Sequence, residues 1–373
     1  MGKSNFEVTK MNVEAKENRN RIPQPLYTGP WGSCHIQGIC VDKKKGYIYY
    51  SFTTKLVKAT LDGKIVGSID GLVGHLGCIA FNEKDGCVYG SLVYKNDIIG
   101  REILAKLDSK TSFEDGFYVV RIDVDKIDRV DMAADGSNIM TAVYIREAVE
   151  DYNGFGTNAK GEKVPHKHGC SGIDGTTFGP LPGKKMEDGM YLYVSYGVYS
   201  DLDRVDNDYQ VLLCYDITDW DKVALPLKQD AMHQSGFEKP LHKFFVFTGN
   251  TNFGVQNLEY DPFSNAFYMA VYKGKKENYP NYPLFAVDAS VPAKWEKLRG
   301  MDFEGETLTL LEAGEKDEKS GVRGFLFPFG STGLYSFGDG EYLVCEKRKT
   351  TAGQCGYIFR YAFDGTTPFM MIG

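Results

Sequence analysis

The sequence lacks several features that would point to common classes of protein. It has no run of 18 apolar residues, so no membrane-spanning helix is expected. The first 25 residues contain no apolar signal core. Basic residues are not in excess, because 43 Lys and Arg stand against 50 Asp and Glu, for a net charge of −7. This balance disfavours a nucleic-acid partner.

Motifs for several kinds of chemistry are also missing. The chain contains no Walker A loop, no GxSxG and no HExxH, which argues against nucleotide hydrolases, serine hydrolases and zincins. We therefore expect no nucleotide cofactor. The eight cysteines form no CxxC pair, and several of them lie in apolar runs, among them Cys40, Cys78, Cys214 and Cys345. Reduced, buried cysteines are typical of a cytoplasmic protein, and we expect that location.

Aromatic residues and glycine are abundant. The 373 residues include 24 Tyr, 23 Phe and 42 Gly but 3 Trp, and the apolar runs are short. This composition is typical of an all-β protein with many turns.

A repeat of four strands runs along the chain. Its first strand is apolar and interrupted by Gly, its second is rich in Tyr, its third ends in Asp or a polar turn, and its fourth is apolar. First strands begin near His35, His75, Gly169, Gly254 and Gly330, and fourth strands near Lys64, Asn138, Lys243, Glu306 and Pro368. A four-stranded antiparallel unit cannot bury both of its faces alone, and radial stacking of such units solves that problem.

The repeat predicts an all-β fold, a β-propeller of five four-stranded blades in one domain over 1–373. The expected blades span 31–70, 71–145, 168–249, 250–311 and 330–373. Another blade number and a different β fold are the alternatives. One expectation for an arm over 1–30, whose stretch FEVTKMNVE at 6–14 alternates in polarity, is that it pairs with the last blade and closes the ring, and the alternative is a loose tail. Over nearly its whole length the chain resembles β-propeller proteins in general, a fold that hosts hydrolases, lyases, sugar binders and scaffolds.

The resemblance implies that the first strands line a central channel, so polar residues where they begin should meet at one mouth. Four of the six His lie at or just before first strands, and we favour three of them, together with Gln256, as ligands of one divalent metal such as Mn, Fe, Ni or Zn. These three are His35, His75 and His168, the last preferred to His166 because it is nearer its strand. The alternative is that these imidazoles only form hydrogen bonds that plug the channel.

Basic and aromatic residues gather where the second strands end. An acidic protein that collects them on one rim suits an anionic small molecule, and Tyr rings suit sugars. The expected substrate-binding residues are Gln37, Lys95, Arg101, Asn257, Tyr272, Lys273 and Lys347. We expect no nucleic-acid or membrane partner, and the sequence does not specify an oligomeric state.

These residues favour an enzyme that acts on a small acidic carbohydrate by metal-assisted β-elimination. The candidate catalytic residues are His35, His75, Tyr196, Asp174 and Glu346. A glycoside hydrolase that uses Asp174 with Glu346 is one alternative, and a non-catalytic sugar- or protein-binding propeller, without perturbed groups at the mouth, is another.

Three further segments carry expectations. The stretch from about Lys95 to Gly116 contains charge and Gly, so we interpret it as a loop within the second blade. The acidic run 201–208 lacks the Gly and terminal Glu of an EF-hand loop, so we interpret it as a solvated turn. The long connection 146–168 contains three Gly that would permit it to move as a lid over the site.

Overall fold

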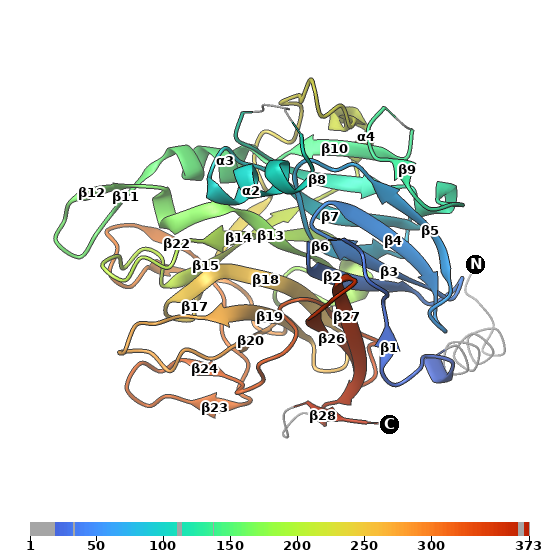
Figure 1. Ribbon diagram of the computed structural model, residues 1–373. Coiled ribbons are helices and arrows are strands. Elements are labelled where there is room, and N and C mark those ends of the chain that lie inside the picture. The colour runs from blue at the N-terminus through green and yellow to red at the C-terminus, as the bar shows by residue number, and fades with distance from the viewer. Residues whose placement is uncertain (1–18, 33, 110–113, 137, 365–368, 373) are drawn as a thin grey trace.

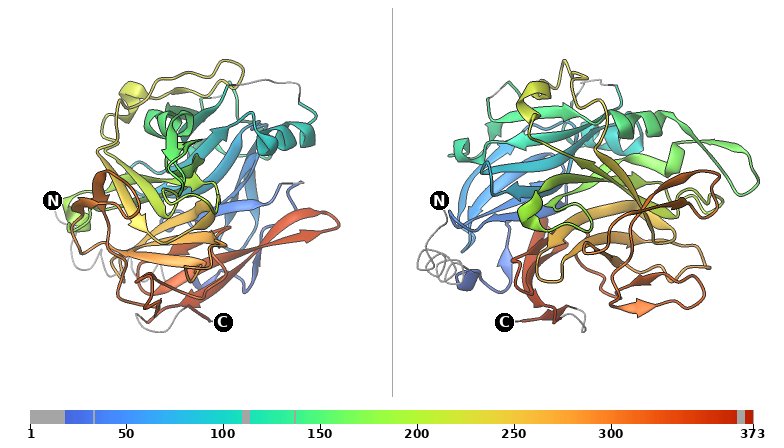
Figure 2. Two further views of the ribbon diagram at one scale, coloured as in Figure 1. Left: turned by 90° about the vertical axis from the view of Figure 1, so that its left-hand side faces the viewer. Right: turned by 180° about the vertical axis from the view of Figure 1, so that it is seen from behind.

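The computed structural model describes residues 19–32, 34–109, 114–136, 138–364 and 369–372. Five β-sheets follow one another around a common centre, from blue to red in Figures 1 and 2. The chain forms a five-bladed β-propeller. The alternation of apolar runs with Gly-containing turns that predicted the fold recurs as antiparallel neighbours in each sheet.

The strands of each blade run outward from the channel in chain order. Blade 1 comprises β2 (Ile36–Asp42), β3 (Tyr47–Phe52), β4 (Lys55–Thr60) and β5 (Ile65–Asp70). Blade 2 comprises β6 (His75–Asn82), β7 (Cys87–Tyr94), β8 (Gly116–Ile122) and β10 (Met140–Tyr144). Blade 3 comprises β13 (Cys170–Gly179), β14 (Tyr191–Val198), β15 (Tyr209–Tyr215) and β17 (His242–Phe247).

The last two blades are less regular. Blade 4 comprises β18 (Thr251–Asp261), β19 (Ala266–Lys273) and β20 (Leu284–Asp288), with outer bridges from Leu310 and Phe325. Blade 5 comprises β25 (Leu334–Ser336), β26 (Glu341–Thr350), β27 (Gly353–Ala362) and β28 (Met370–Met371).

Connections hold short elements of their own. The helices are α2 (Ile98–Lys106), α3 (Arg146–Asn153) and α4 (Trp220–Val223), with 3-10 turns η1 (Val124–Lys126), η2 (Lys167–Gly169) and η3 (Met186–Asp188). Two hairpins are formed by β11 (Phe155–Thr157) with β12 (Lys163–Pro165), which projects from the body in Figure 1, and by β23 (Glu315–Lys316) with β24 (Arg323–Gly324).

The N-terminal arm meets the last blade. Strand β1 (Leu26–Tyr27) pairs antiparallel with β27, so the blue and red parts of the chain lie side by side in Figure 1. Leu26 is buried in a cluster with Ile36 of blade 1 and Ile358 of blade 5. The segment 6–14 that we expected to make this pairing lies outside the described residues.

The chain of one blade also supplies outer strands to the blade before it. The connection between the third and fourth strands of blade 2 supplies β9 (Met132–Ala133) to β5 of blade 1. The same connection of blade 3 supplies β16 (Leu225–Pro226) to β10 of blade 2. After β20 of blade 4, β21 (Lys294–Lys297) and β22 (Glu304–Thr307) join the outer edge of blade 3. We call these segments the latch strands.

The position of latch strand β22 shows that one predicted strand assignment is wrong. The stretch that begins at Glu306 was expected to be the fourth strand of blade 4, but Glu306 and Thr307 pair with β17 of blade 3. The chain then crosses over, because Thr309 and Leu311 form backbone hydrogen bonds with β20 of blade 4. The stretch from Glu306 to Leu311 therefore pairs first with the outer edge of blade 3 and then with that of blade 4.

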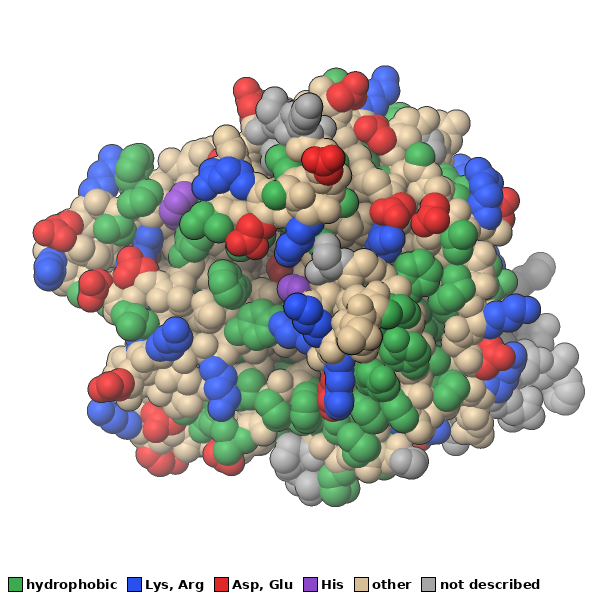
Figure 3. Space-filling view, viewed as in Figure 1, with side chains coloured by type: hydrophobic (Ala, Val, Ile, Leu, Met, Phe, Trp, Pro, Cys, Tyr) green, Lys and Arg blue, Asp and Glu red, His purple; other side chains and the backbone are tan. Residues whose placement is uncertain are grey.

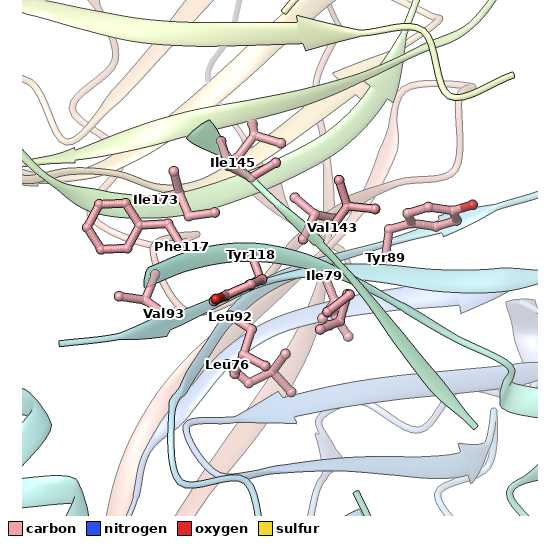
Figure 4. Packing of buried hydrophobic residues seen from close by; sticks show 14 of the residues in the cluster. Leu76, Ile79, Tyr89, Leu92, Val93, Phe117, Tyr118, Val143, Ile145 and Ile173 are labelled. Atoms are coloured by element: carbon pink, nitrogen blue, oxygen red, sulfur yellow. The ribbon is translucent and has the colours of Figure 1, made fainter. Parts of the chain in front are cut away.

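Apolar residues fill the spaces between blades. Figure 4 shows Val93 and Phe117 of blade 2 lying close to Ile173 of blade 3, within the largest buried cluster. All eight cysteines are free, and all but Cys87 are buried, as expected for reduced core residues. Within the described ranges, no helix has the length and apolar character needed to cross a membrane.

Candidate active site

A recess of about 560 Å³ opens at the end of the channel where the inner strands begin. Figure 3 shows a His and several Lys or Arg side chains around a hollow near the middle of one face. Eight of the predicted site residues line the recess: His35, Gln37, His75, Lys95, Asp174, Gln256, Tyr272 and Lys347. Blades 1 to 4 contribute through their inner strands, and blade 5 contributes through Lys347 of β26.

Irregularities in the inner strands aim these side chains. The pairing register shifts between Ile36 and Gly38, between Leu76 and Ile79, and between Ile173 and Thr176. A further shift lies next to Gln256 in β18. A bulge turns a side chain out of the regular alternation, and bulges are common beside active sites. The polar residues at these positions point into the channel as a result.

Asp174 is the buried carboxyl of the recess. Its side chain is 7% exposed, and Oδ1 accepts a hydrogen bond from the Cys78 backbone N–H at 3.1 Å. Burial raises the pKa of Asp174 to about 7, against the lowering effects of that hydrogen bond and of Lys95. Gly77 makes this contact possible, because a Cβ at that position would lie 2.1 Å from Asp174 Oδ1.

The two imidazoles of the recess are neutral at physiological pH. Burial, together with the charges of Lys347 and Lys106, lowers the pKa of His35 to about 4. Burial, His35 and Lys95 lower the pKa of His75 to about 3. A hydrogen bond of 3.2 Å joins His35 Nε2 to the amide of Gln37, which also donates to Thr53.

Two lysines are held in place by neighbours. Lys95 Nζ donates to the Ser171 carbonyl at 2.9 Å and forms an ion pair with Asp97 at 3.0 Å. Lys347 Nζ donates to Tyr272 Oη at 2.8 Å and lies over the Tyr272 ring. These contacts place two ammonium groups at the recess without neutralising Lys347.

Helix α2 forms one wall of the recess and was missed in the sequence, where 95–116 was interpreted as a loop. Its residues Ile99, Glu102, Ile103 and Lys106 line the cavity. They share one helical face, and this spacing, after an Asp97 that caps the helix by accepting from Gly100, is the signal that would have identified it. Ser171, Asn252 and Phe253 are further lining residues that the repeat alone did not indicate.

His168 does not join the other histidines. It lies in η2 with φ of +56°, buried against the rings of Phe245 and Phe303 on the outer part of blade 3. Its Nε2 is 3.9 Å from Asp151. The Gly-rich run from Gly169 turns the chain before β13 starts, so the predicted metal-ligand set of His35, His75, His168 and Gln256 is not assembled. The described residues contain no group of three or more His, Cys, Asp or Glu placed to hold a metal.

Two candidate catalytic residues lie outside the recess. Tyr196 is fully buried, and its hydroxyl donates to Asp151 at 3.0 Å. Glu346 forms an ion pair with Arg348. Because side chains alternate along a strand, the position of Lys347 in the recess turns Glu346 away from it. The carboxylate pair expected for a glycoside hydrolase is therefore not formed by Asp174 and Glu346.

Three expected binding residues also do not line the cavity. Arg101 donates to the Asn96 carbonyl beside its own helix, and Lys273 is exposed at the end of β19. Asn257 is buried and donates to the carbonyls of Gln37 and Ser331, so it ties inner strands of blades 4, 1 and 5 across the channel.

The structure describes both of the remaining segments. The run 201–208 is solvated only where it begins: residues 201–203 are exposed, but Asp206 pairs with Arg204 and Asp208 with Lys276, and these four are buried. No residue of 146–168 lines the recess. That connection is anchored instead, since Ala148 and Val149 of α3 are buried in the core.

Comparisons with known proteins find distant structural neighbours and no related sequence. No protein-family model matches it, and no curated protein matches its sequence. Among solved structures, it is similar to a GH43 β-1,3-galactosidase bound to galactodeoxynojirimycin (TM-score 0.45, 11% identity, 93% of this chain and 97% of the other). It is also similar to the Dos1 propeller (TM-score 0.32, 11% identity, 87% and 77%) and to the PQQ domain of pyranose dehydrogenase from Coprinopsis cinerea (0.33, 13%, 86% and 81%). These scores carry no argument about the site.

Proposed function

We propose that the protein is a cytoplasmic enzyme that acts on a small acidic carbohydrate in the recess by β-elimination. The observation that supports this is the meeting of one buried carboxyl, two neutral imidazoles and several lysines in one cavity. A non-catalytic binding propeller has no need of such a group of perturbed side chains. Free cysteines throughout the chain support the proposed location.

The lining suits a sugar acid. Lys95, Lys106 and Lys347 offer positive charge to a carboxylate, against Glu102 and Asp174. Phe253 and Tyr272 present aromatic surface on which a sugar ring can stack. The neutral rings of His35 and His75 and the amide of Gln256 can bond to hydroxyl groups.

Asp174 is the proposed acid–base group. Its ionised carboxyl removes the proton on the carbon next to the substrate carboxylate, and lysine charge stabilises the electron density that develops there. That electron pair forms the carbon–carbon double bond as the bond to the β-oxygen breaks. The proton held by Asp174 passes to the departing oxygen, so the step needs no further reactant. A pKa of about 7 suits both halves of this cycle.

A metal is not part of this step. Three of the four predicted ligands line the recess, but His168 lies on the outer part of blade 3, against Phe245 and Phe303. The residues present therefore fit the predicted four-ligand centre poorly. Elemental analysis of untagged wild-type protein beside His75→Ala tests the point directly, since loss of one bound equivalent in the variant would restore the metal-assisted reaction.

The proposed reaction is tested by incubating the protein with oligosaccharides that contain uronic acids. We expect new double-bond absorbance with wild-type protein, and a loss of at least 100-fold in kcat for Asp174→Asn. Lys349→Ala, an exposed change on the same strand as Lys347, is the matched control and should retain full activity. New reducing ends without a double bond would contradict elimination, and binding without turnover would contradict catalysis.

A further inference from the structure

A second cavity, of about 760 Å³, lies at the opposite end of the channel, where the inner strands end. All five blades contribute to it through Val41, Phe81, Phe178, Tyr260 and Phe337. We call it the lower cavity. It shares no lining residue with the recess, and Asn257 crosses the channel without lining either space.

Three carboxyls of the lower cavity, those of Asp85, Asp216 and Glu259, form no ion pair within the described residues. Asp85 and Asp216 accept hydrogen bonds from the hydroxyls of Tyr89 and Thr218. Glu259 Oε1 accepts a hydrogen bond from the Ser336 backbone N–H at 2.7 Å. The cation that acts on it, Lys43, is itself paired with Glu83 at 3.1 Å. Burial raises the pKa of Glu259 to about 8, against the effect of the Ser336 hydrogen bond.

Tyr335 supplies a second polar group to the lower cavity. The residue is 8% exposed and lines the cavity together with Glu259. Its environment contains Glu259 and Cys40, both of which raise its pKa beyond the effect of burial. Glu259 and Tyr335 thus bring a carboxyl and a hydroxyl to the same cavity.

The charge at this end of the channel is opposite to that of the recess. The lower cavity is lined by five acidic residues, namely Glu83, Asp85, Asp216, Asp221 and Glu259, and by three basic residues, namely Lys43, Lys84 and Arg121. Arg121 and Lys43 are engaged by Asp221 and Glu83. The recess is lined by three lysines against two acids. The lower cavity therefore disfavours the anions that suit the recess.

We propose that the lower cavity binds an organic cation, with its ammonium group at Glu259 and Tyr335 and its apolar or aromatic body against Phe81, Phe178 and Phe337. The aromatic walls supply apolar contact area and faces that attract a cation. A partly buried carboxyl without an ion pair gains from a charged partner, because solvent compensates its charge only in part. This site is independent of the reaction proposed for the recess.

Cation binding is coupled to a proton at Glu259. The charged and titratable groups that act on this carboxyl are Asp261 on its own strand, Lys43 after β2, and Tyr335 of β25. Near pH 7 the empty site holds a proton on Glu259. An ammonium group favours the ionised carboxylate, so binding should release close to one proton.

The test is calorimetric titration with tryptamine as the cationic probe, tryptophol as its neutral analogue and indole-3-acetate as its anionic analogue. We expect tryptamine to bind at least about tenfold more tightly than tryptophol, and indole-3-acetate not to compete with tryptamine. Glu259→Gln should lose the preference for the cation. Glu102→Gln, the matched change in the recess, should keep it.

Equal binding of tryptamine and tryptophol, no binding of tryptamine, or loss of the preference in Glu102→Gln instead would each overturn the proposal. If Glu259→Gln does not fold, the wild-type protein still decides the question. Titration near pH 7 in two buffers of different ionisation heat measures the released proton, and binding without proton release would overturn the site at Glu259.

Discussion

Two carboxyl groups, one at each end of the channel, are held where charge is unfavourable. Asp174 and Glu259 each accept one backbone hydrogen bond, and burial nevertheless raises the pKa of both above the ordinary value. The folded protein would thus be more stable with neutral side chains at these two positions than with ionised carboxylates. Active sites commonly trade stability for function in this way.

Asp174→Asn should increase stability at alkaline pH. The folded-state pKa of Asp174 is about 7 and its ordinary value is 3.8, so folded protein binds the extra proton between these values and loses stability as pH rises through them. Asn carries no such dependence. We expect denaturant unfolding to show the variant gaining about 2–4 kcal/mol over wild type from pH 4 to pH 8, at about 1.4 kcal/mol per pKa unit. A constant difference between the two proteins across this range would refute the assignment.

The activity of the recess should depend on the same group. If Asp174 removes the proton, kcat/KM rises with pH through about 7 and then levels off. His35 and His75 stay neutral above about pH 4 and add no further step near neutrality. Initial rates between pH 5 and 9 check this, and a rate that falls as pH rises through 7 would instead indicate that Asp174 acts as an acid.

Whether a residue could be placed in the recess from the sequence depended on how clearly its strand shows where it begins. His35 and His75 were found because each begins a first strand with clear alternation, and the structure places both in the recess. The prediction that His168 joins them was wrong because a left-handed turn precedes β13, and nothing in a Gly-rich run shows where such a turn lies. Asp174 was found by its strand, but its partner Cys78 belongs to another blade and leaves no local signal.

At the scale of elements, regular strands were predictable and contacts between distant elements were not. The five first strands follow from alternation and Gly turns. Helix α2 was not predicted because charged residues and Gly are typical of loops, although one helical face carries Ile99 and Ile103. Strand β1 is two residues long, too short for any pattern to show.

Ring closure by β1 can be tested with two neighbouring residues. Leu26 is 1% exposed and packs between blades 1 and 5, whereas Tyr27 beside it is 42% exposed. Leu26→Ala should lower the free energy of unfolding by about 2–5 kcal/mol, as for other buried leucines. Tyr27→Ala is the control and should cost less than 1 kcal/mol. Equal effects in urea unfolding would show that β1 does not hold the ring.

At the scale of the whole molecule, the latch strands make the outer edges of blades 1, 2 and 3 depend on the blade that follows. Blades 1, 2 and 3 each receive an outer strand from the chain of the following blade. The sequence gives no hint of this exchange, because β9 and β16 are two residues long and lie within connections. The number of blades can be predicted by counting strands in the sequence. The pairing of latch strands with the preceding blade cannot, because it is visible only in the folded structure.

Leu227 offers a test of this linkage. It is fully buried directly after β16, and its N–H donates to Met140 of β10 at 3.1 Å. We expect Leu227→Ala to cost about 2–5 kcal/mol and to weaken amide-exchange protection in blades 2 and 3 together. The control is Leu225→Ala, which changes a 44% exposed residue of the same latch. Loss of protection confined to one blade would contradict the coupling.

The latches also impose an order on biosynthesis. A ribosome delivers β10 long before β16, and β17 long before β22, so the outer edge of a blade stays unpaired until much of its successor has emerged. Nascent blades 1, 2 and 3 therefore each have an unpaired outer edge for a time, the kind of surface that can pair with another chain. Slow translation between residues 144 and 225 would prolong that exposure for blade 2, whereas blade 5 waits for nothing, because its partner β1 was made first.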